Sequence, residues 1–226
     1  MPTNAVPGFA KSDAQAVAER LRELRIAAGD VPAGYKVGFT NARVREQFGA
    51  DGLLAATVYK QTILSERAVV AASYLGPRLE PEVVLGVEGG EVAWAALAFE
   101  IVQSHASDWK FGWIDAIADF GLHAALIVGE RRALGKGEAA GFAGLRVRLL
   151  QDAEVVERGG GSDIDGGPLA SVVWLREDLA RCGRSLGDGE LVSTGSLTRV
   201  PAIVPGERWT VEAEDGALAA LSIEVV

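Results

Sequence analysis

The chain has 226 residues, of which 49% are hydrophobic, and its formal net charge is −9. This proportion of hydrophobic residues is enough for a packed core and argues against disorder. An acidic chain without a run of basic residues is a poor candidate for binding nucleic acid or anionic membranes. The single cysteine, Cys182, excludes an intrachain disulfide and a thiolate zinc cluster. With no secretory signal in residues 1–10 and no membrane span, we expect a soluble cytoplasmic protein.

Helix and strand signals are mixed in the first half of the chain. Val17, Leu21 and Leu24 recur at helical spacing and predict a helix over residues 12–28, which Gly29 ends. The elements expected next are a strand at 35–39, a short helix from 41 to 48, strand or loop at 57–64, a weak element at 68–74, a strand at 79–88 and a helix running into a strand at 92–104.

Strand signals predominate in the second half. The elements expected there are a helix at 114–124, a buried strand at 125–128, a hairpin at 144–157, a glycine-rich loop at 159–167, a helix at 168–181 and strands at 190–193, 200–204, 209–213 and 218–225. This order is not a regular alternation of strand and helix, which argues against a Rossmann sheet or a TIM barrel.

The sharpest chemical signal is a pair of glutamates, Glu80 and Glu82, next to an apolar run. Side chains two apart on a strand share a face, so the two carboxylates repel each other unless a cation or a proton relieves them. Glu100 lies in a second apolar segment, where a charge is out of place unless it is paired. We therefore predict that the three glutamates bind Mg²⁺ or Mn²⁺, the alternative being solvent-exposed positions on half-buried elements.

Two lysines suggest roles beside the glutamates. Lys36 stands between Gly34 and Gly38, and it can steer an anionic substrate or stabilise an enolate, although an exposed strand lysine fits the same pattern. Asp108 and Lys110 form a second close acid–base pair, which also fits an ordinary surface turn.

Seven stretches of the chain match a known family in order. They are GYKVGFTN at 34–41, RLEPEVVLGV at 78–87, AFEIVQS at 98–104, DWKF at 108–111, DAIAD at 115–119, GPLASVVWL at 167–175 and TGSLTRVPAIVPGE at 194–207. Through them the chain, from about residue 34 to its end, resembles the 2-hydroxypenta-2,4-dienoate hydratases and 4-oxalocrotonate decarboxylases of the fumarylacetoacetate hydrolase superfamily.

This resemblance implies a mixed α+β, mainly β fold: a fumarylacetoacetase-like β roll with a few peripheral helices. Residues 1–33 then form a short N-terminal helical segment, and residues 34–226 form the catalytic domain. The resemblance assigns metal binding to Glu80, Glu82 and Glu100, and catalytic roles to Lys36, Asp108 and Lys110. It also implies a homo-oligomer that acts on a small 2-oxo acid.

The chain departs from the family pattern in several places. The N-terminal region and the segment between Glu82 and Glu100 are short. Leu-Ala-Ala stands at 54–56 where the family often has Asp-Phe-Gly, and Phe-Gly-Leu-His stands at 120–123 in place of Asn-Ala-Ser-Ser. A serine expected to touch substrate is therefore missing, and we assign its place to His123, which can donate to a carboxylate, move a proton or simply pack.

The expected activity is hydration of a 2-oxoalk-4-enoate, or of its dienol, to a 4-hydroxy-2-oxo acid. Ser196, Thr198 and Arg199 are assigned to substrate binding. The alternatives are decarboxylation of an oxalocrotonate-like diacid, whose distal carboxylate needs a cation such as Arg199, hydrolysis of an acylpyruvate, and a catalytically reduced partner subunit.

Overall fold

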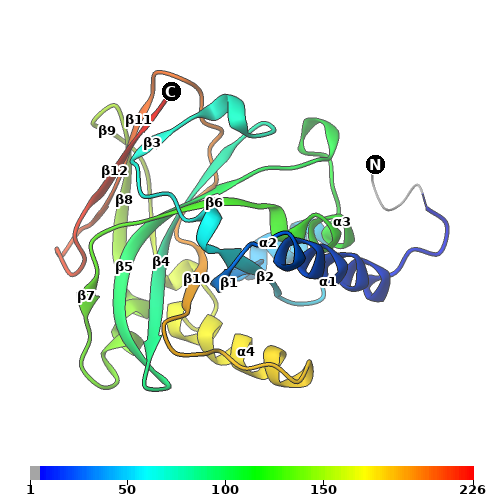
Figure 1. Ribbon diagram of the computed structural model, residues 1–226. Helices are drawn as coiled ribbons and strands as arrows, with labels where there is room; N and C mark the ends of the chain where they lie inside the picture. The colour runs from blue at the N-terminus through cyan, green and yellow to red at the C-terminus, as the bar shows by residue number, and fades with distance from the viewer. Residues whose placement is uncertain (1–5) are drawn as a thin grey trace.

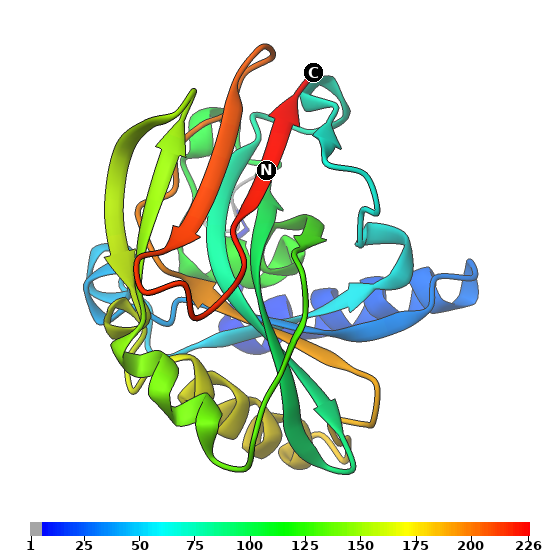
Figure 2. The ribbon, with the colours of Figure 1, turned by 90° about the vertical axis from the view of Figure 1, so that its left-hand side faces the viewer.

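Two β-sheets and a few peripheral helices make up the computed structural model, which describes residues 6–226 (Figure 1, Figure 2). The strands are β1 (Pro32–Gly38), β2 (Leu54–Tyr59), β3 (Ala68–Val69), β4 (Arg78–Glu88), β5 (Glu91–Val102), β6 (His123–Val128), β7 (Arg132–Ala133), β8 (Arg146–Gln151), β9 (Glu154–Gly160), β10 (Leu191–Ser196), β11 (Arg208–Ala213) and β12 (Leu221–Val225). The larger sheet has the order β2-β1-β10-β4-β5-β6, with β7 paired to β5, and the smaller has the order β3-β12-β11-β8-β9.

The helices are α1 (Lys11–Ala27), α2 (Ala42–Phe48), α3 (Trp113–Ala118) and α4 (Pro168–Arg181), joined by short 3-10 turns at 60–62, 71–73, 107–109, 120–122, 138–144 and 161–163. Helices α1 and α3 pack together at one side of the molecule, and α4 contacts β10 and β4 (Figure 1). Within residues 6–226, no helix combines the length and apolar character that crossing a membrane requires. Residues 1–5 of the predicted N-terminal segment lie outside this range, and the division at residue 33 stays a prediction.

The structure confirms the mixed, mainly β fold and corrects two element predictions. The segment at 92–104 is not a helix running into a strand, because Glu91–Val102 pairs along its length with β4 and continues into pairing with β6. Both faces of this strand are buried and carry apolar residues. The segment therefore lacks the alternation of apolar and polar residues by which a half-exposed strand is recognised in a sequence. The strand predicted at 200–204 is also wrong, since only an isolated bridge joins Ala202 to Arg78 there.

The two faces of the larger sheet have different surroundings. Alternate residues of β4 and β5, such as Leu85 and Phe99, join the main core together with Trp209 and Val211 of the smaller sheet. Residues of the opposite face, such as Val84, Ala96 and Ala98, belong to a second buried cluster. Because side chains alternate along a strand, Glu80, Glu82 and Glu100 share this second face.

A bulge in the β4–β5 hairpin sets the register that brings the glutamates together. Near the turn Glu88 pairs with Glu91, but the register shifts by one residue between Gly86 and Val87, after which Glu80 pairs with Glu100. Without this shift Glu80 would lie opposite Phe99, and Glu100 would point to the other face of the sheet. The bulge therefore places the third carboxylate on the side of the first two.

Candidate metal centre

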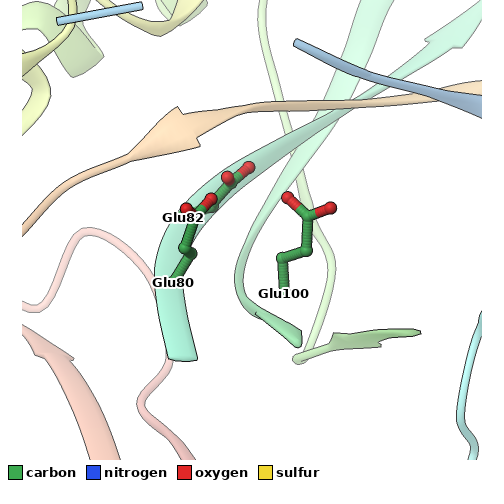
Figure 3. Close-up of side chains that lie close together, drawn as sticks. All are labelled: Glu80, Glu82 and Glu100. Atoms are coloured by element: carbon green, nitrogen blue, oxygen red, sulfur yellow. The ribbon is translucent and has the colours of Figure 1, made fainter. Parts of the chain in front are cut away.

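Three carboxylates converge on one face of the larger sheet. Glu80 and Glu100 are directly opposite each other across β4 and β5, and Glu82 is the next residue on the same face of β4. One oxygen of each lies within 4.8 Å of the others, and Figure 3 shows the side chains gathered above the two strands. Glu82 and Glu100 have no exposed surface, whereas Glu80 is partly buried. This is a compact set of hard oxygen donors in a site shielded from water.

Each fully buried carboxylate has one oxygen fixed by protein donors and one without a hydrogen bond. Oε2 of Glu82 accepts from the Ser193 hydroxyl and from the Gly195 amide at 3.0 Å, whereas Oε1 has no partner. Oε1 of Glu100 is bonded to His123 Nδ1 at 2.7 Å, whereas Oε2 has no hydrogen bond. Buried oxygens are rarely left without a hydrogen bond, so Oε1 of Glu82 and Oε2 of Glu100 are suited to bind a cation.

Lys36 places a buried positive charge beside Glu100. It lies on β1, is 3% exposed, and its ammonium is 3.3 Å from Oε2 of Glu100. The ammonium also donates to the Gly121 carbonyl at 2.9 Å. Phe120, Gly121 and Leu122 all have positive φ, so a strained turn presents this carbonyl to the lysine. The 120–123 segment, where the chain departs from the family pattern, thus contacts both Lys36 and Glu100.

The charges at the centre perturb one another. Burial raises the pKa of Glu80 to about 7, with Lys36 opposing the shift and Glu100 adding to it. Burial, followed by the charges of Glu100 and Glu80, holds the pKa of Glu82 well above its usual range. Burial opposes ionisation of Glu100 most strongly, but Lys36 and His123 together outweigh it and lower its pKa. Burial likewise disfavours the Lys36 ammonium, yet the three carboxylates outweigh it and raise the pKa of Lys36.

These properties fit Mg²⁺ or Mn²⁺. Three carboxylates and one ammonium leave excess negative charge in a buried space, and both ions prefer oxygen ligands. The raised pKa values of Glu80 and Glu82 show that the carboxylates are poorly compensated by the protein alone. The residues present can therefore hold the predicted ion, with Glu80, Glu82 and Glu100 as its ligands.

Metal binding is expected to strengthen as pH rises from about 4.5 to about 7, because the cation must displace the proton held by Glu80. In the unfolded chain a glutamate releases its proton near 4.5, whereas Glu80 in the folded, metal-free protein does so at about 7. Between about pH 4.5 and about pH 7 the folded state thus binds more protons, and the stability of the metal-free protein falls as pH rises through this window, by at most about 1.4 kcal/mol per pH unit for each proton. Mn²⁺ titrations and denaturant unfolding measure the two effects, and a pH-independent affinity would contradict this linkage.

The other predicted site residues lie in more exposed surroundings. The Asp108 and Lys110 side chains are 78% and 81% exposed, and their charged groups are 3.7 Å apart. The Ser196 hydroxyl donates to the Thr198 carbonyl, and the Thr198 hydroxyl donates to that of Arg199. Arg199 is 88% exposed and pairs with Glu157 at 2.6 Å. Ser196 is the cross-strand partner of Glu82 on β10, whereas the exposed Asp108, Lys110 and Arg199 side chains are not gathered with the buried glutamates. The roles of all five residues in catalysis and substrate binding stay predictions.

Sequence reasoning missed three residues that contact the centre: Ser193, Gly195 and Thr62. Ser193 and Gly195 hold Glu82, and Thr62 is hydrogen-bonded to His123 at 2.9 Å. Gly195 has φ of +113°, and a Cβ there would lie 2.0 Å from the Thr40 hydroxyl oxygen, so only glycine brings this amide close to Glu82. The one available signal was a glycine just after the strand predicted at 190–193.

Two cavities flank the fold outside the glutamate cluster. One of about 180 Å³ reaches the 120–123 segment and is lined by Leu21, Arg25, Gln103, His105, Asp119, Phe120, Leu122 and His123. The other, of about 580 Å³, lies along β3 and β12 and is lined by none of the site residues. The smaller cavity is therefore the one next to the candidate chemistry.

Comparison with known proteins finds relatives that align with most of the chain. No model of a known protein family matches the chain. The 2-keto-4-pentenoate hydratase of Paraburkholderia phymatum is 28% identical over 219 residues, which cover 89% of this chain and 81% of the relative. The 4-oxalocrotonate decarboxylase of Pseudomonas putida is 28% identical over 224 residues, which cover 92% and 84% respectively.

A solved structure supports the same relationship. The 4-oxalocrotonate decarboxylase of Pseudomonas putida G7, complexed with magnesium and adipate, matches with a TM-score of 0.90 and 25% identity over 99% of this chain and 89% of that one. The chain is homologous to the 2-keto-4-pentenoate hydratases and the 4-oxalocrotonate decarboxylases. Fumarylpyruvate hydrolase from Pseudomonas aeruginosa, solved with Mn²⁺ and pyruvate, has a TM-score of 0.60 and 17% identity over 87% of this chain and 90% of that one, and shows the shared fold alone.

Proposed function

We propose that this protein is a Mg²⁺- or Mn²⁺-dependent lyase that hydrates a 2-oxoalk-4-enoate, or its 2-hydroxydienoate tautomer, to a 4-hydroxy-2-oxo acid. The observation that carries the proposal is the convergence of Glu80, Glu82 and Glu100. Neither Oε1 of Glu82 nor Oε2 of Glu100 accepts a hydrogen bond, and the Lys36 ammonium lies 3.3 Å from the latter. Homology to the hydratases and decarboxylases supports the reaction class of this site, since both groups of enzymes act on small 2-oxo acids or their enols.

Glu80, Glu82 and Glu100 would hold the cation, which supplies Lewis acidity toward negative charge on the substrate's 2-oxygen. The Lys36 ammonium would stabilise that charge, and its bond to the Gly121 carbonyl fixes its position before the reaction begins. Burial of Lys36 and Glu100 lowers the local dielectric and strengthens this stabilisation. The dienol first ketonises by taking up a proton at C5, which leaves a double bond between C3 and C4 conjugated to the 2-oxo group. Water then adds its oxygen to C4, and C3 takes up a proton to complete the hydration.

The charge distribution favours hydration over decarboxylation. A diacid brings a second carboxylate, which needs a cation of its own in a buried site. Among residues 6–226, Lys36 is the one lysine or arginine that is buried. Arg199, the cation assigned to this carboxylate, is exposed and already paired with Glu157. A monoacid with an uncharged tail therefore suits the centre better than a diacid.

An activity comparison tests this proposal. Purified protein with Mn²⁺ would be given 2-hydroxypenta-2,4-dienoate, 4-oxalocrotonate and an acylpyruvate, with chelated protein as the matched control. We expect metal-dependent loss of the dienol absorbance without CO₂. CO₂ release from oxalocrotonate would favour the decarboxylase, cleavage of the acylpyruvate would favour the hydrolase, and no turnover of any substrate would favour a partner subunit.

We further propose that the protein acts in the cytoplasm as a homo-oligomer. Helix α1 supports the second statement, because Val17, Leu21 and Leu24 are between 39% and 48% exposed on it. An apolar stripe of this kind is typical of a surface that another chain covers. The mass of the protein in solution, measured by light scattering, tests the oligomer, and a monomer at micromolar concentration would contradict it.

A further inference from the structure

His123 reaches the metal centre through a second bulge in the larger sheet. Glu100 pairs with Leu126 and Ile101 with Ala125, but the register then shifts so that Val102 pairs with His123. The extra residue moves His123 to the face that Val102 shares with Glu100. The histidine side chain is completely enclosed there.

Both ring nitrogens of His123 have partners. Nδ1 is 2.7 Å from Oε1 of Glu100, and Nε2 is 2.9 Å from the Thr62 hydroxyl. An ionised carboxylate only accepts hydrogen bonds, so Nδ1 carries a hydrogen and donates it to Glu100. The Thr62 hydroxyl accepts from the Tyr59 amide at 3.2 Å, and its own hydrogen is available to His123 Nε2 or to the Tyr59 carbonyl at 3.0 Å. Thr62 is thus anchored to the backbone while it holds the ring.

We propose that Thr62 and His123 form a positioning pair that locks the Glu100 carboxylate with Oε1 bound by the protein and Oε2 presented to the metal and Lys36. This inference rests on the proposed function, because it concerns the same metal site. A flexible carboxylate can bind with either oxygen, and fixing one of them removes that freedom before the ion arrives. Partners of this kind typically contribute 10- to 100-fold in metal affinity or activity.

The arrangement assigns His123 a different role from substrate contact. Both nitrogens are engaged and the side chain has no exposed surface, so no ring atom is free for a ligand. A positioning residue should change the affinity for the metal, and saturating metal should largely restore turnover. A residue that touches the substrate should lower kcat at any metal concentration.

The experiment compares Mn²⁺ affinity, followed by electron paramagnetic resonance of the free ion, with kcat at saturating Mn²⁺. H123L removes both hydrogen bonds, whereas H123N keeps an N–H donor near the Nδ1 position. T62V removes the anchor with little change in shape, and T62S keeps it. H105L is the matched control, because His105 forms a 2.6 Å bond to Asp119 but is 62% exposed. Thermal unfolding of each metal-free variant measures folding separately.

We expect affinity to fall about 10- to 100-fold in H123L and less in T62V, with near wild-type binding in H123N, T62S and H105L. At saturating Mn²⁺, kcat of H123L should recover to within about tenfold of wild type. Wild-type affinity in both H123L and T62V would overturn the inference, as would equal losses in H123N and H123L or a kcat that stays low at saturating metal. Failure of the wild-type protein itself to bind Mn²⁺ would instead overturn the proposed function.

Discussion

Replacement of Glu82 by glutamine should abolish metal binding and lower activity roughly a thousandfold, while leaving the metal-free protein at least as stable as wild type. The glutamine carbonyl can accept from Ser193 and Gly195 as Oε2 does, which turns its NH₂ group toward the cation. Loss of metal assistance is worth several kcal/mol in the transition state, which is roughly three powers of ten in rate. In the metal-free protein, burial and the acidic neighbours hold the pKa of Glu82 well above its usual range. Removing this carboxylate should therefore stabilise the metal-free protein.

Thermal unfolding with and without Mn²⁺ measures this result. At a Mn²⁺ concentration about 100 times Kd, the wild-type protein should gain about 2.7 kcal/mol of stability, whereas E82Q should gain almost none. E88Q is the matched control, because Glu88 lies on the same strand but is exposed. If E82Q retained the Mn²⁺-induced stabilisation, Glu82 would not be a ligand.

Replacement of Lys36 by methionine should separate turnover from metal binding. Methionine fills similar space beside Leu54 and Gly121 but removes the ammonium. We expect kcat to fall roughly 10²- to 10³-fold, the usual consequence of removing a group that stabilises developing oxyanion charge. Mn²⁺ should bind at least as tightly as in wild type, because a positive charge 3.3 Å from Oε2 of Glu100 has been removed.

The comparison uses metal-saturated protein, in which the cation offsets the lost ammonium and keeps the variant folded. K136M is the matched control, since Lys136 is exposed and outside the centre. A wild-type kcat in K36M would show that Lys36 takes no part in the reaction. A large loss of Mn²⁺ affinity would mean that Lys36 shapes the metal site instead.

Much of the architecture and the core of the site followed from local patterns. The alternation in Glu80-Pro81-Glu82 predicts a shared face, and the structure places both side chains there. The helices at 12–28 and 168–181 followed from apolar spacing and appear with boundaries close to those expected. The strand at 92–104 was misread because both of its faces are buried, and a continuous apolar run has no period that distinguishes strand from helix.

The sequence by itself determined the mainly β class, the residue types of the centre and its preference for a hard cation, because these depend on side-chain chemistry and local periodicity. Only the tertiary structure decided which face Glu100 and His123 occupy. One bulge turns Glu100 toward Glu80, and another turns His123 toward Glu100. A shift of one residue moves a side chain across the sheet, and that shift is set by long-range packing, such as the Trp94 ring lying against Gly86, rather than by the neighbouring residues.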